Sequence, residues 1–169
     1  MDKLKTALHE SGHAVAHIRL GIQQDDMTII PDGIAYGAVS SEGINHVTNA
    51  EDAHDMVQAY CAGYASLIAH GYSKELALVG CDDDFEKAFE LNESWDLKLN
   101  LERYKALTVE LMSQPMNLTA VKLLADYVLK RERVAGDVIE VLVELSDGDC
   151  TKAEFDRFMA MRTACPWER

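Results

Sequence analysis

The sequence predicts a mainly α-helical fold with a small β-hairpin near the N-terminus and a C-terminal helical bundle. Apolar residues recur at helical spacing over most of the chain, whereas β-prone residues next to turn signals occupy one short stretch after residue 26. The chain has 169 residues, 48% of them hydrophobic and 27% charged, a composition typical of one globular domain. A chain of this length buries about two thirds of its unfolded surface, so it needs no disulfides to fold.

The composition also argues against several classes of protein. The formal net charge of −13 is unfavourable for a nucleic-acid-binding face and for binding to an anionic membrane surface. The four cysteines, Cys61, Cys81, Cys150 and Cys165, show no C-x-x-C spacing, so we expect reduced thiols. We find neither a signal peptide nor a run of 18 apolar residues, which predicts a cytoplasmic protein without a membrane span.

The most informative stretch is His-Glu-Ser-Gly-His at positions 9–13. It lies in a segment predicted to be helical from about Lys3 to Leu20 and to end at Gly21, a usual residue after a helix C-terminus. In a helix His9 and His13 are one turn apart on one face, so both imidazoles can reach one zinc ion. Glu10 is then the candidate general base beside that ion.

Gly12 and His17 lead to two further expectations about the surroundings of this helix. Gly12 lies in the helix interior, where glycine costs about 1 kcal/mol against alanine, so we expect a neighbouring element to pack closely against it. His17 continues the line of His9 and His13. His9 and His17 are about 12 Å apart along the axis at 1.5 Å per residue, so they cannot easily share one ion. We therefore expect His17 to be a polar residue on the wall of a cleft.

Two histidines and one glutamate leave the third protein ligand of a catalytic zinc site unassigned. The chain lacks an H-x-x-G-x-x-H extension, because Arg19 stands at that position, and it lacks an E-x-x-x-D helix at the usual distance. The candidates for the third ligand are His46, His54, His70 and the acidic group Asp82, Asp83 and Asp84. The three aspartates have a simpler explanation as well, since acidic residues are favoured at a helix start.

The predicted hairpin consists of a strand over Met27–Ile30, a Pro-Asp-Gly turn and a second strand over Ile34–Ser40. In a zincin-like site an edge strand beside the metal helix can hold an extended peptide by strand addition. This makes Thr28, Ile29 and Ile30 candidate substrate-binding residues. The alternative is that the hairpin only covers the helix.

The remaining segments are predicted to be helical. A long helix is expected from Ala50 to about His70 with Asn49 as N-cap. A second helix runs from the acidic group past Trp95 to about Ser113, either continuous or with a break, and Pro115 ends it. Further helices are expected over Asn117–Arg131, Gly136–Leu145 and the residues after a Thr151–Glu154 capping box. We expect one domain, in which residues 1–113 form the part with the metal site and residues 114–169 form the C-terminal helical part.

Several segments resemble the peptidase domain of the FtsH-type AAA proteases. Residues 6–14, TALHESGHA, are similar to T-A-x-H-E-A-G-H-A, and residues 27–37, MTIIPDGIAYG, to V-T-I-I-P-R-G-x-A-x-G. Residues 62–66, AGYAS, stand where the family has G-G-R-A-A, and residues 80–88, GCDDDFEKA, resemble G-A-S-N-D-I-E-R-A. With a weaker similarity of residues 129–134 to the C-terminal helices, the resemblance extends over about residues 6–145.

The resemblance implies that Asp84 is the third zinc ligand beside His9 and His13, and that Glu10 is the general acid and base. It implies a zinc metalloendopeptidase that hydrolyses peptide bonds of peptides or unfolded proteins. Tyr64 stands where the family has arginine and Leu67 where it has glutamate, and we expect no ATPase module or membrane helix in this chain.

These differences keep other hypotheses open. One is a non-proteolytic zinc-binding adaptor or regulator derived from such a peptidase. Another is a helical module without a metal. The candidate partners are a peptide or unfolded protein substrate, further copies of the chain and a separate ATPase.

Overall fold

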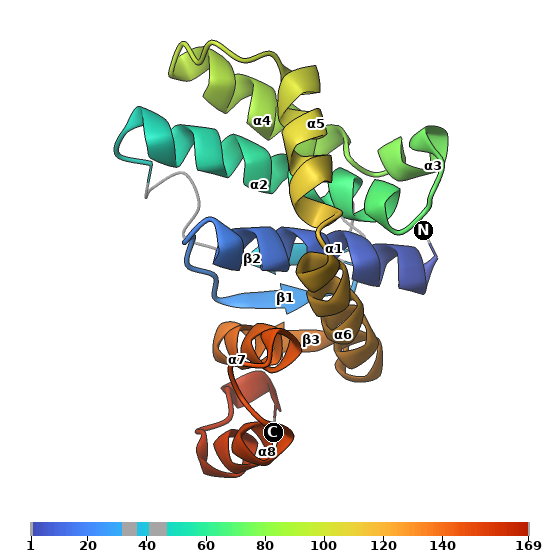
Figure 1. The fold of residues 1–169 in the computed structure, drawn as a ribbon, viewed down its shortest axis with the longest axis vertical. Helices are drawn as coiled ribbons and strands as arrows, with labels where there is room; N and C mark the ends of the chain where they lie inside the picture. The colour runs from blue at the N-terminus through green and yellow to red at the C-terminus, as the bar shows by residue number, and fades with distance from the viewer. Residues whose placement is uncertain (1, 32–36, 41–46, 169) are drawn as a thin grey trace.

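The computed structural model describes residues 2–31, 37–40 and 47–168 (Figure 1). Within these residues the protein is mainly α-helical, as predicted, with eight α-helices, three short strands and a 3-10 turn. In chain order the elements are α1 Lys3–Arg19, β1 Asp26–Thr28, β2 Ala38–Ser40, α2 Ala50–Ala69, α3 Lys74–Leu78, α4 Asp82–Ser94, α5 Leu101–Met112, α6 Pro115–Arg131, β3 Arg133–Ala135, α7 Gly136–Asp147, α8 Lys152–Met161 and η2 Pro166–Glu168.

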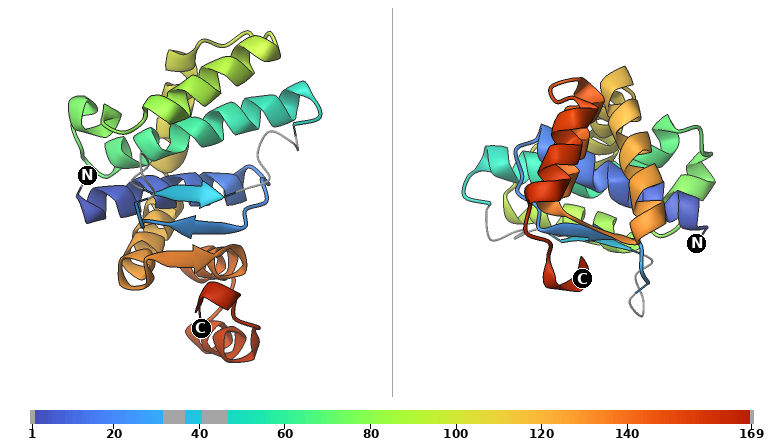
Figure 2. Two further views of the ribbon diagram at one scale, coloured as in Figure 1. Left: turned by 180° about the vertical axis from the view of Figure 1, so that it is seen from behind. Right: turned by 90° about the horizontal axis from the view of Figure 1, so that it is seen from below.

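Helix α1 lies in the middle of the molecule, with α2 on one side and the sheet, α6 and α7 on the other (Figures 1 and 2). Helices α4 and α5 pack on the outer side of α2. The core that joins these layers includes Val15 of α1, Met27 of β1, Leu124 of α6 and Ile139 of α7, all of them fully buried. Helix α1 is therefore covered by neighbouring elements along most of its length, and its residues from Lys5 to His17 are buried.

Gly12 marks the closest approach between α1 and α2. A Cβ atom at this position would lie 2.4 Å from the Cβ of Ser66 and 2.7 Å from the carbonyl oxygen of Ala62. Ser66 also donates a hydrogen bond of 2.7 Å to the carbonyl oxygen of Leu8. The expectation that another element packs tightly on Gly12 is confirmed, and this contact brings α2 against the histidine face of α1.

The sheet is antiparallel with the strand order β2-β1-β3. Asp26 of β1 pairs with Ser40 of β2 on one side and with Ala135 of β3 on the other. The predicted hairpin is confirmed for the residues in β1 and β2, but the expectation of two strands only is wrong. The third strand has three residues between two helices and shows no alternating pattern that would reveal it. Residues 32–36 of the predicted hairpin lie outside the described residues.

The segment after the acidic group contains the break that the sequence left open: it forms two helices, α4 and α5, because the chain turns at Asp96 with a φ of 47° and Asn100 caps the next helix. Helix α5 ends at Met112, close to the predicted end at about Ser113. The helices differ from the prediction in two places. Helix α6 begins at Pro115 and not at Asn117, because a proline in the first turn lacks only an N–H that has no partner within the helix. The short helix α3 was not predicted. In contrast, Asn49 caps α2 and Thr151 forms a capping box with Glu154, both as predicted.

The C-terminal helices are tied to α1 through Arg19. Its guanidinium group donates two hydrogen bonds to the carboxylate of Asp147, 2.7 and 2.8 Å long, and a third of 2.7 Å to Asn117 Oδ1. This residue occupies the position at which the sequence lacks a histidine ligand, and in the structure it fixes α6 and α7 to the end of α1.

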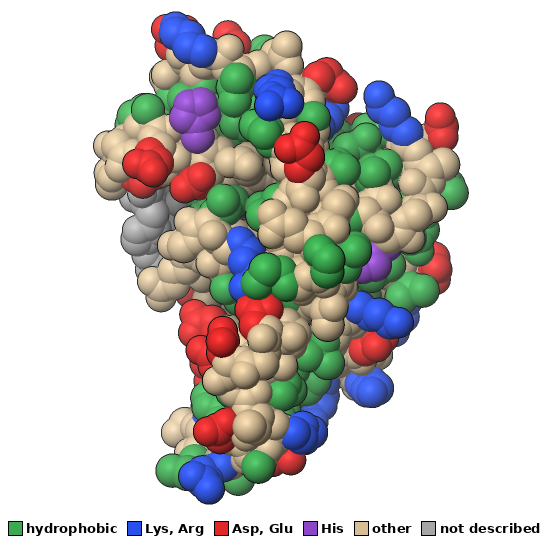
Figure 3. Space-filling model, viewed as in Figure 1, with side chains coloured by type: hydrophobic (Ala, Val, Ile, Leu, Met, Phe, Trp, Pro, Cys, Tyr) green, Lys and Arg blue, Asp and Glu red, His purple; other side chains and the backbone are tan. Residues whose placement is uncertain are grey.

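On the face shown in Figure 3, acidic and basic side chains are interspersed, and no broad basic surface is present among the described residues of that face. None of the helices in the described part of the chain combines the length and the apolar character needed to cross a bilayer.

Candidate metal centre

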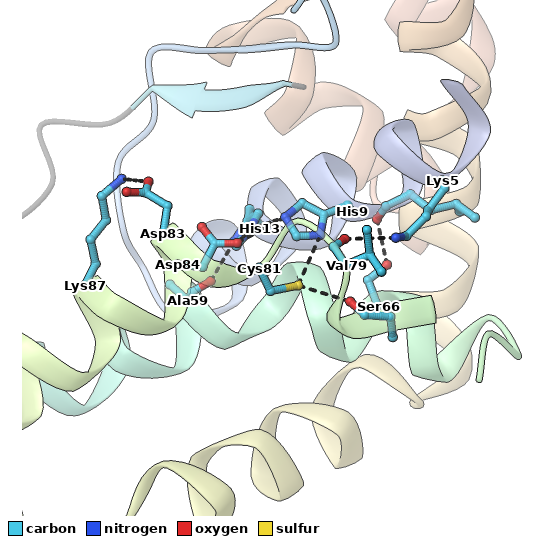
Figure 4. Close-up of polar contacts among 12 residues, drawn as sticks. Lys5, His9, His13, Ala59, Ser66, Val79, Cys81, Asp83, Asp84 and Lys87 are labelled. Atoms are coloured by element: carbon cyan, nitrogen blue, oxygen red, sulfur yellow. Dashed lines mark hydrogen bonds and ion pairs between the residues drawn. The ribbon is translucent and has the colours of Figure 1, made fainter. Parts of the chain in front are cut away.

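The two histidines of α1 meet an aspartate from the first turn of α4 (Figure 4). The Nε2 atoms of His9 and His13 are 3.1 Å apart. Asp84 Oδ2 lies 3.1 Å from His9 Nε2 and 3.3 Å from His13 Nε2. Helix α1 places the histidines one turn apart, and the turn between α3 and α4 brings the carboxylate to them. The three residues expected as metal ligands from the sequence and the resemblance thus lie close together.

The spacing of these three atoms suits a metal ion. In a tetrahedral site with nitrogen and oxygen ligands at about 2.0–2.1 Å, neighbouring ligand atoms are about 3.3 Å apart. Gly63 of α2 makes room for this arrangement. A Cβ atom at residue 63 would lie 2.5 Å from the Nε2 atoms of both His9 and His13. The backbone of α2 therefore lines the position toward which both imidazoles point.

The ring of His13 has the orientation that metal-binding histidines usually have. Its Nδ1 lies 2.8 Å from the carbonyl oxygen of Ala59. Because a carbonyl oxygen only accepts, Nδ1 carries the hydrogen, and Nε2 of the neutral ring has its lone pair directed at His9 and Asp84. A hydrogen bond of this kind fixes both the tautomer and the direction of a ligand histidine.

Cys81 also contacts this group. His9, Cys81 and Asp84 offer donor atoms that all lie within 4.8 Å of one another, and this buried group could hold a metal ion. The distances that involve Cys81 are longer than those of the His9, His13 and Asp84 set, since its Sγ atom is 4.0 Å from His9 Nδ1. Burial raises the pKa of the Cys81 thiol to about 12. The tighter set of donors therefore contains His13, and Cys81 lies behind the His9 ring.

The charges of Asp84 and His13 stabilise each other. Burial alone would raise the pKa of Asp84, but His13 and His9 hold it well below the ordinary value. Burial alone would lower the pKa of His13, but the Asp84 carboxylate, with a contribution from Glu10, raises it to about 9. A metal ion bound at His13 Nε2 therefore displaces a proton, as is usual for histidine ligands.

Glu10 lies beside the ligands and is 5% exposed. Burial raises its pKa, against the influence of His9 and His13 and with that of Asp84. A Cβ atom at Gly37 would lie 2.7 Å from Glu10 Oε1, so the residue before β2 packs directly against this carboxylate. The site thus combines three donor atoms with a buried carboxyl group that is easier to protonate than an exposed one.

The other candidate ligands lie elsewhere or are engaged differently. His46 lies outside the described residues. The Nδ1 atom of His54 is hydrogen-bonded to the hydroxyl of Tyr104, and His70 Nδ1 lies 2.8 Å from the carbonyl oxygen of Ser66 at the end of α2. Asp83 pairs with Lys87 at 2.5 Å. His54, His70 and Asp83 therefore do not belong to the group around His9.

His17 lies one turn beyond His13 and is 6% exposed. Burial, with a smaller effect of His13, lowers its pKa to about 4, so its ring is neutral at physiological pH. Its Nδ1 atom has no hydrogen-bond partner in the part of the chain that the structure describes. The expectation that His17 is separate from the ligand group agrees with this position.

The predicted substrate strand needs a correction. Strand β1 is the central strand, and the backbone N–H of Ile29 donates to the carbonyl oxygen of Glu132 at 2.8 Å. The expectation of a free edge at Thr28 and Ile29 is therefore wrong, and the outer edge on the α2 side of the sheet belongs to β2 (Figure 2). Ile30 is 49% exposed and lines a cavity of about 310 Å³ with Tyr127, Arg133 and Trp167 among others.

In comparisons by sequence, no protein-family model and no curated protein matches the chain. The fold and the site define a mainly helical protein with a candidate metal centre between α1, α2 and α4. Its function is therefore argued from the geometry of this centre.

Proposed function

We propose that the protein is a zinc-dependent metallopeptidase that hydrolyses peptide bonds of peptides or unfolded proteins without an ATPase of its own. The observation that carries the proposal is the triangle of His9 Nε2, His13 Nε2 and Asp84 Oδ2, with edges of 3.1–3.3 Å, next to the buried carboxyl group of Glu10. Two imidazoles and one carboxylate are a ligand set that suits zinc in catalytic sites, which keep one position open for water.

A zinc ion held by these residues would lower the pKa of a bound water to about 7. The chain itself supplies the group that carries the proton during hydrolysis. Glu10 accepts a proton from the attacking water on its carboxylate, and it donates that proton to the amine nitrogen when the C–N bond breaks. Because burial raises the pKa of Glu10, the carboxyl group can hold the proton between these two steps.

The substrate is proposed to bind as an extended strand along the outer edge of β2. This strand lies beside α1, and Gly37, which precedes it, contacts the Glu10 carboxylate. A peptide added there forms main-chain hydrogen bonds that do not depend on its sequence. Such binding suits unfolded chains, whose backbone is free to pair.

The test is a Glu10→Gln variant with Glu90→Gln, an exposed glutamate on α4, as the matched control. Glu10→Gln removes the proton acceptor but none of the three ligands. We expect the zinc content to stay as in the wild type and the cleavage of unfolded casein to fall by about 10²–10⁴-fold. The control should cleave normally. Undiminished cleavage by Glu10→Gln would contradict the mechanism.

A second candidate function is a zinc-binding adaptor or regulator without peptidase activity. The observation that favours it is the burial of the centre: the exposed fractions of the His9, His13 and Asp84 side chains are 5%, 9% and 21%. Tyr64 packs against Phe85 with ring centroids 5.8 Å apart, where the resembling family has an arginine. Zinc-loaded wild-type protein that leaves unfolded casein intact would favour this function, with a separate ATPase or further copies of the chain as candidate partners.

A further inference from the structure

The two candidate ligand histidines are held in different ways at the nitrogen that faces away from the centre. His13 Nδ1 donates to the carbonyl oxygen of Ala59 at 2.8 Å. His9 Nδ1 instead faces the sulfur of Cys81 at 4.0 Å, with no other partner for this atom in the residues that the structure describes (Figure 4). Ligand histidines almost always donate their second N–H to an acceptor that orients the ring. At His9 a thiol occupies the place of that acceptor.

The position of Cys81 in the chain supports a role directed at His9. Cys81 is the N-cap residue of α4, where serine, aspartate or asparagine would usually accept a hydrogen bond from the helix. The Cys81 side chain makes no such bond. It is fully buried, its thiol donates to the carbonyl oxygen of Ala77 at 3.1 Å, and its sulfur lies 4.0 Å from His9 Nδ1. The thiol hydrogen is therefore used on Ala77, which leaves the sulfur as an acceptor for His9.

The segment that carries Cys81 is fixed to α1 at two successive turns. Lys5, one turn before His9, donates from Nζ to the carbonyl oxygen of Val79 at 2.9 Å. Lys5 is only 6% exposed, and its hydrogen bond to Val79 is partly buried. The contacts of Lys5 with Val79 and of His9 with Cys81 hold the turn before Asp84 in one place. The backbone that carries Cys81 is thus held next to the His9 ring.

From these contacts, and on the basis of the proposed zinc centre, we propose that Cys81 is a positioning residue. Its sulfur accepts the hydrogen bond from His9 Nδ1–H and so directs His9 Nε2 at the metal, without itself being a ligand. Sulfur is a weak acceptor, and the bond is long, so His9 is held less firmly than His13. Removal of this acceptor should weaken metal binding by about tenfold, the lower end of the range for partners of ligand histidines.

The experiment compares wild type, Cys81→Ala and Cys61→Ala. Cys61 is a fully buried thiol of α2, and it serves as the matched control for the loss of a buried sulfur. Co²⁺ is the probe, because its affinity can be measured by competition with a chromophoric chelator and a thiolate ligand adds an intense near-ultraviolet charge-transfer band. We expect Cys81→Ala to bind Co²⁺ about tenfold more weakly, Cys61→Ala to bind as the wild type, and the wild-type spectrum to lack the thiolate band.

A wild-type thiolate band that Cys81→Ala abolishes would overturn the proposal, because Cys81 would then be a ligand. Equal Co²⁺ affinity of wild type and Cys81→Ala would overturn it as well. Nitrogen NMR of the metal-free protein gives a second readout, in which Cys81→Ala should change the Nδ1–H signal of His9 and leave that of His13 unchanged. Loss of peptide cleavage alone would count against the proposed function and not against the role of Cys81.

Discussion

Asp84 Oδ2 lies 3.1 Å from His9 Nε2 although 75 residues separate the two in the chain. The contact depends on the turn before α4, which Lys5 and His9 hold against α1 through Val79 and Cys81. It also depends on α2, whose glycine at position 63 lets both histidine rings approach the backbone. The candidate centre is therefore a product of three helices, and variants in each of them lead to separate predictions.

Asp84→Asn should lower the affinity for zinc by at least about 100-fold, because it replaces a charged ligand and removes the partner of His13. Asp83→Asn is the matched control, since Asp83 pairs with the exposed Lys87 and not with the histidines. The affinity is measured by competition with a chromophoric chelator at fixed pH. Equal affinities of the two variants would show that Asp84 is not a ligand.

Gly63→Ala should abolish metal binding while α2 remains helical. The new Cβ atom would lie 2.5 Å from both Nε2 atoms, so the rings must move away from the position that they share. Alanine is a better helix former than glycine by about 1 kcal/mol, so the helix itself is not weakened. Circular dichroism and zinc content check the two parts of this prediction. A Gly63→Ala protein with a full zinc content would contradict it.

Gly12→Ala should act differently, by separating α1 from α2. Its Cβ atom would lie 2.4 Å from Ser66 Cβ and 2.7 Å from the Ala62 carbonyl oxygen. These two atoms are part of the α2 backbone or bonded directly to it, so they cannot move aside as the end of a flexible side chain can. We expect a loss of about 1–3 kcal/mol in the free energy of unfolding, the usual cost of an overpacked core. Urea denaturation measures it, and an unchanged midpoint would argue against the close contact.

Asp147→Asn should lower the free energy of unfolding at pH 7 by about 2 kcal/mol, because it removes the charged acceptor of two hydrogen bonds from Arg19. These hydrogen bonds lower the pKa of Asp147 in the folded state. The contribution is therefore complete above the unfolded pKa of about 3.9 and is lost as the pH falls through the lower folded value.

The difference in the free energy of unfolding between the wild type and Asp147→Asn should be smaller at pH 3 than at pH 7. Urea denaturation at the two pH values measures it. Asp156→Asn is the control, since Asp156 forms an exposed pair with Lys152 and should change stability little at either pH. A difference between wild type and Asp147→Asn that grows toward pH 3 would contradict the assignment.

The fold could be predicted from the sequence where a local rule decides the structure. Helical periodicity predicts α1, α2, α6 and α7, and the cap at Asn49 and the capping box at Thr151 follow from neighbouring residues alone. Strand β3 could not be predicted in this way, because three residues between two helices become a strand only by pairing with β1. The turn at Asp96 is also unmarked by glycine or proline, the residues that usually reveal a break.

The candidate site likewise contains residues that a local sequence rule predicts and residues that it does not predict. His9, Glu10 and His13 follow from one helical motif, because residues one turn apart share a face. Asp84 could be singled out from its two acidic neighbours only by the resemblance of residues 80–88, since spacing gives no reason to prefer it. Cys81 was expected to be an ordinary reduced thiol. Its contact with His9 Nδ1 depends on how the turn before α4 packs on α1, which no local pattern encodes.

Removal of the metal should separate its effect on stability from its effect on catalysis. The core that joins α1, β1, α6 and α7 does not include the ligands, so we expect the metal-free protein to remain folded. Zinc at 100 times its Kd should stabilise the wild type by about 2.7 kcal/mol, because it binds the folded state only. Thermal unfolding with added zinc, compared with thermal unfolding after chelation, measures this difference as a shift in Tm.

The same measurement on two variants assigns the roles of the residues. Asp84→Asn should lose the zinc-dependent rise in Tm, because it lacks a ligand. Glu10→Gln should keep the rise while it loses peptide cleavage, because Glu10 acts on the proton and not on the metal. If Glu10→Gln also lost the rise, Glu10 would contribute to metal binding, and its assignment as the general base would be wrong.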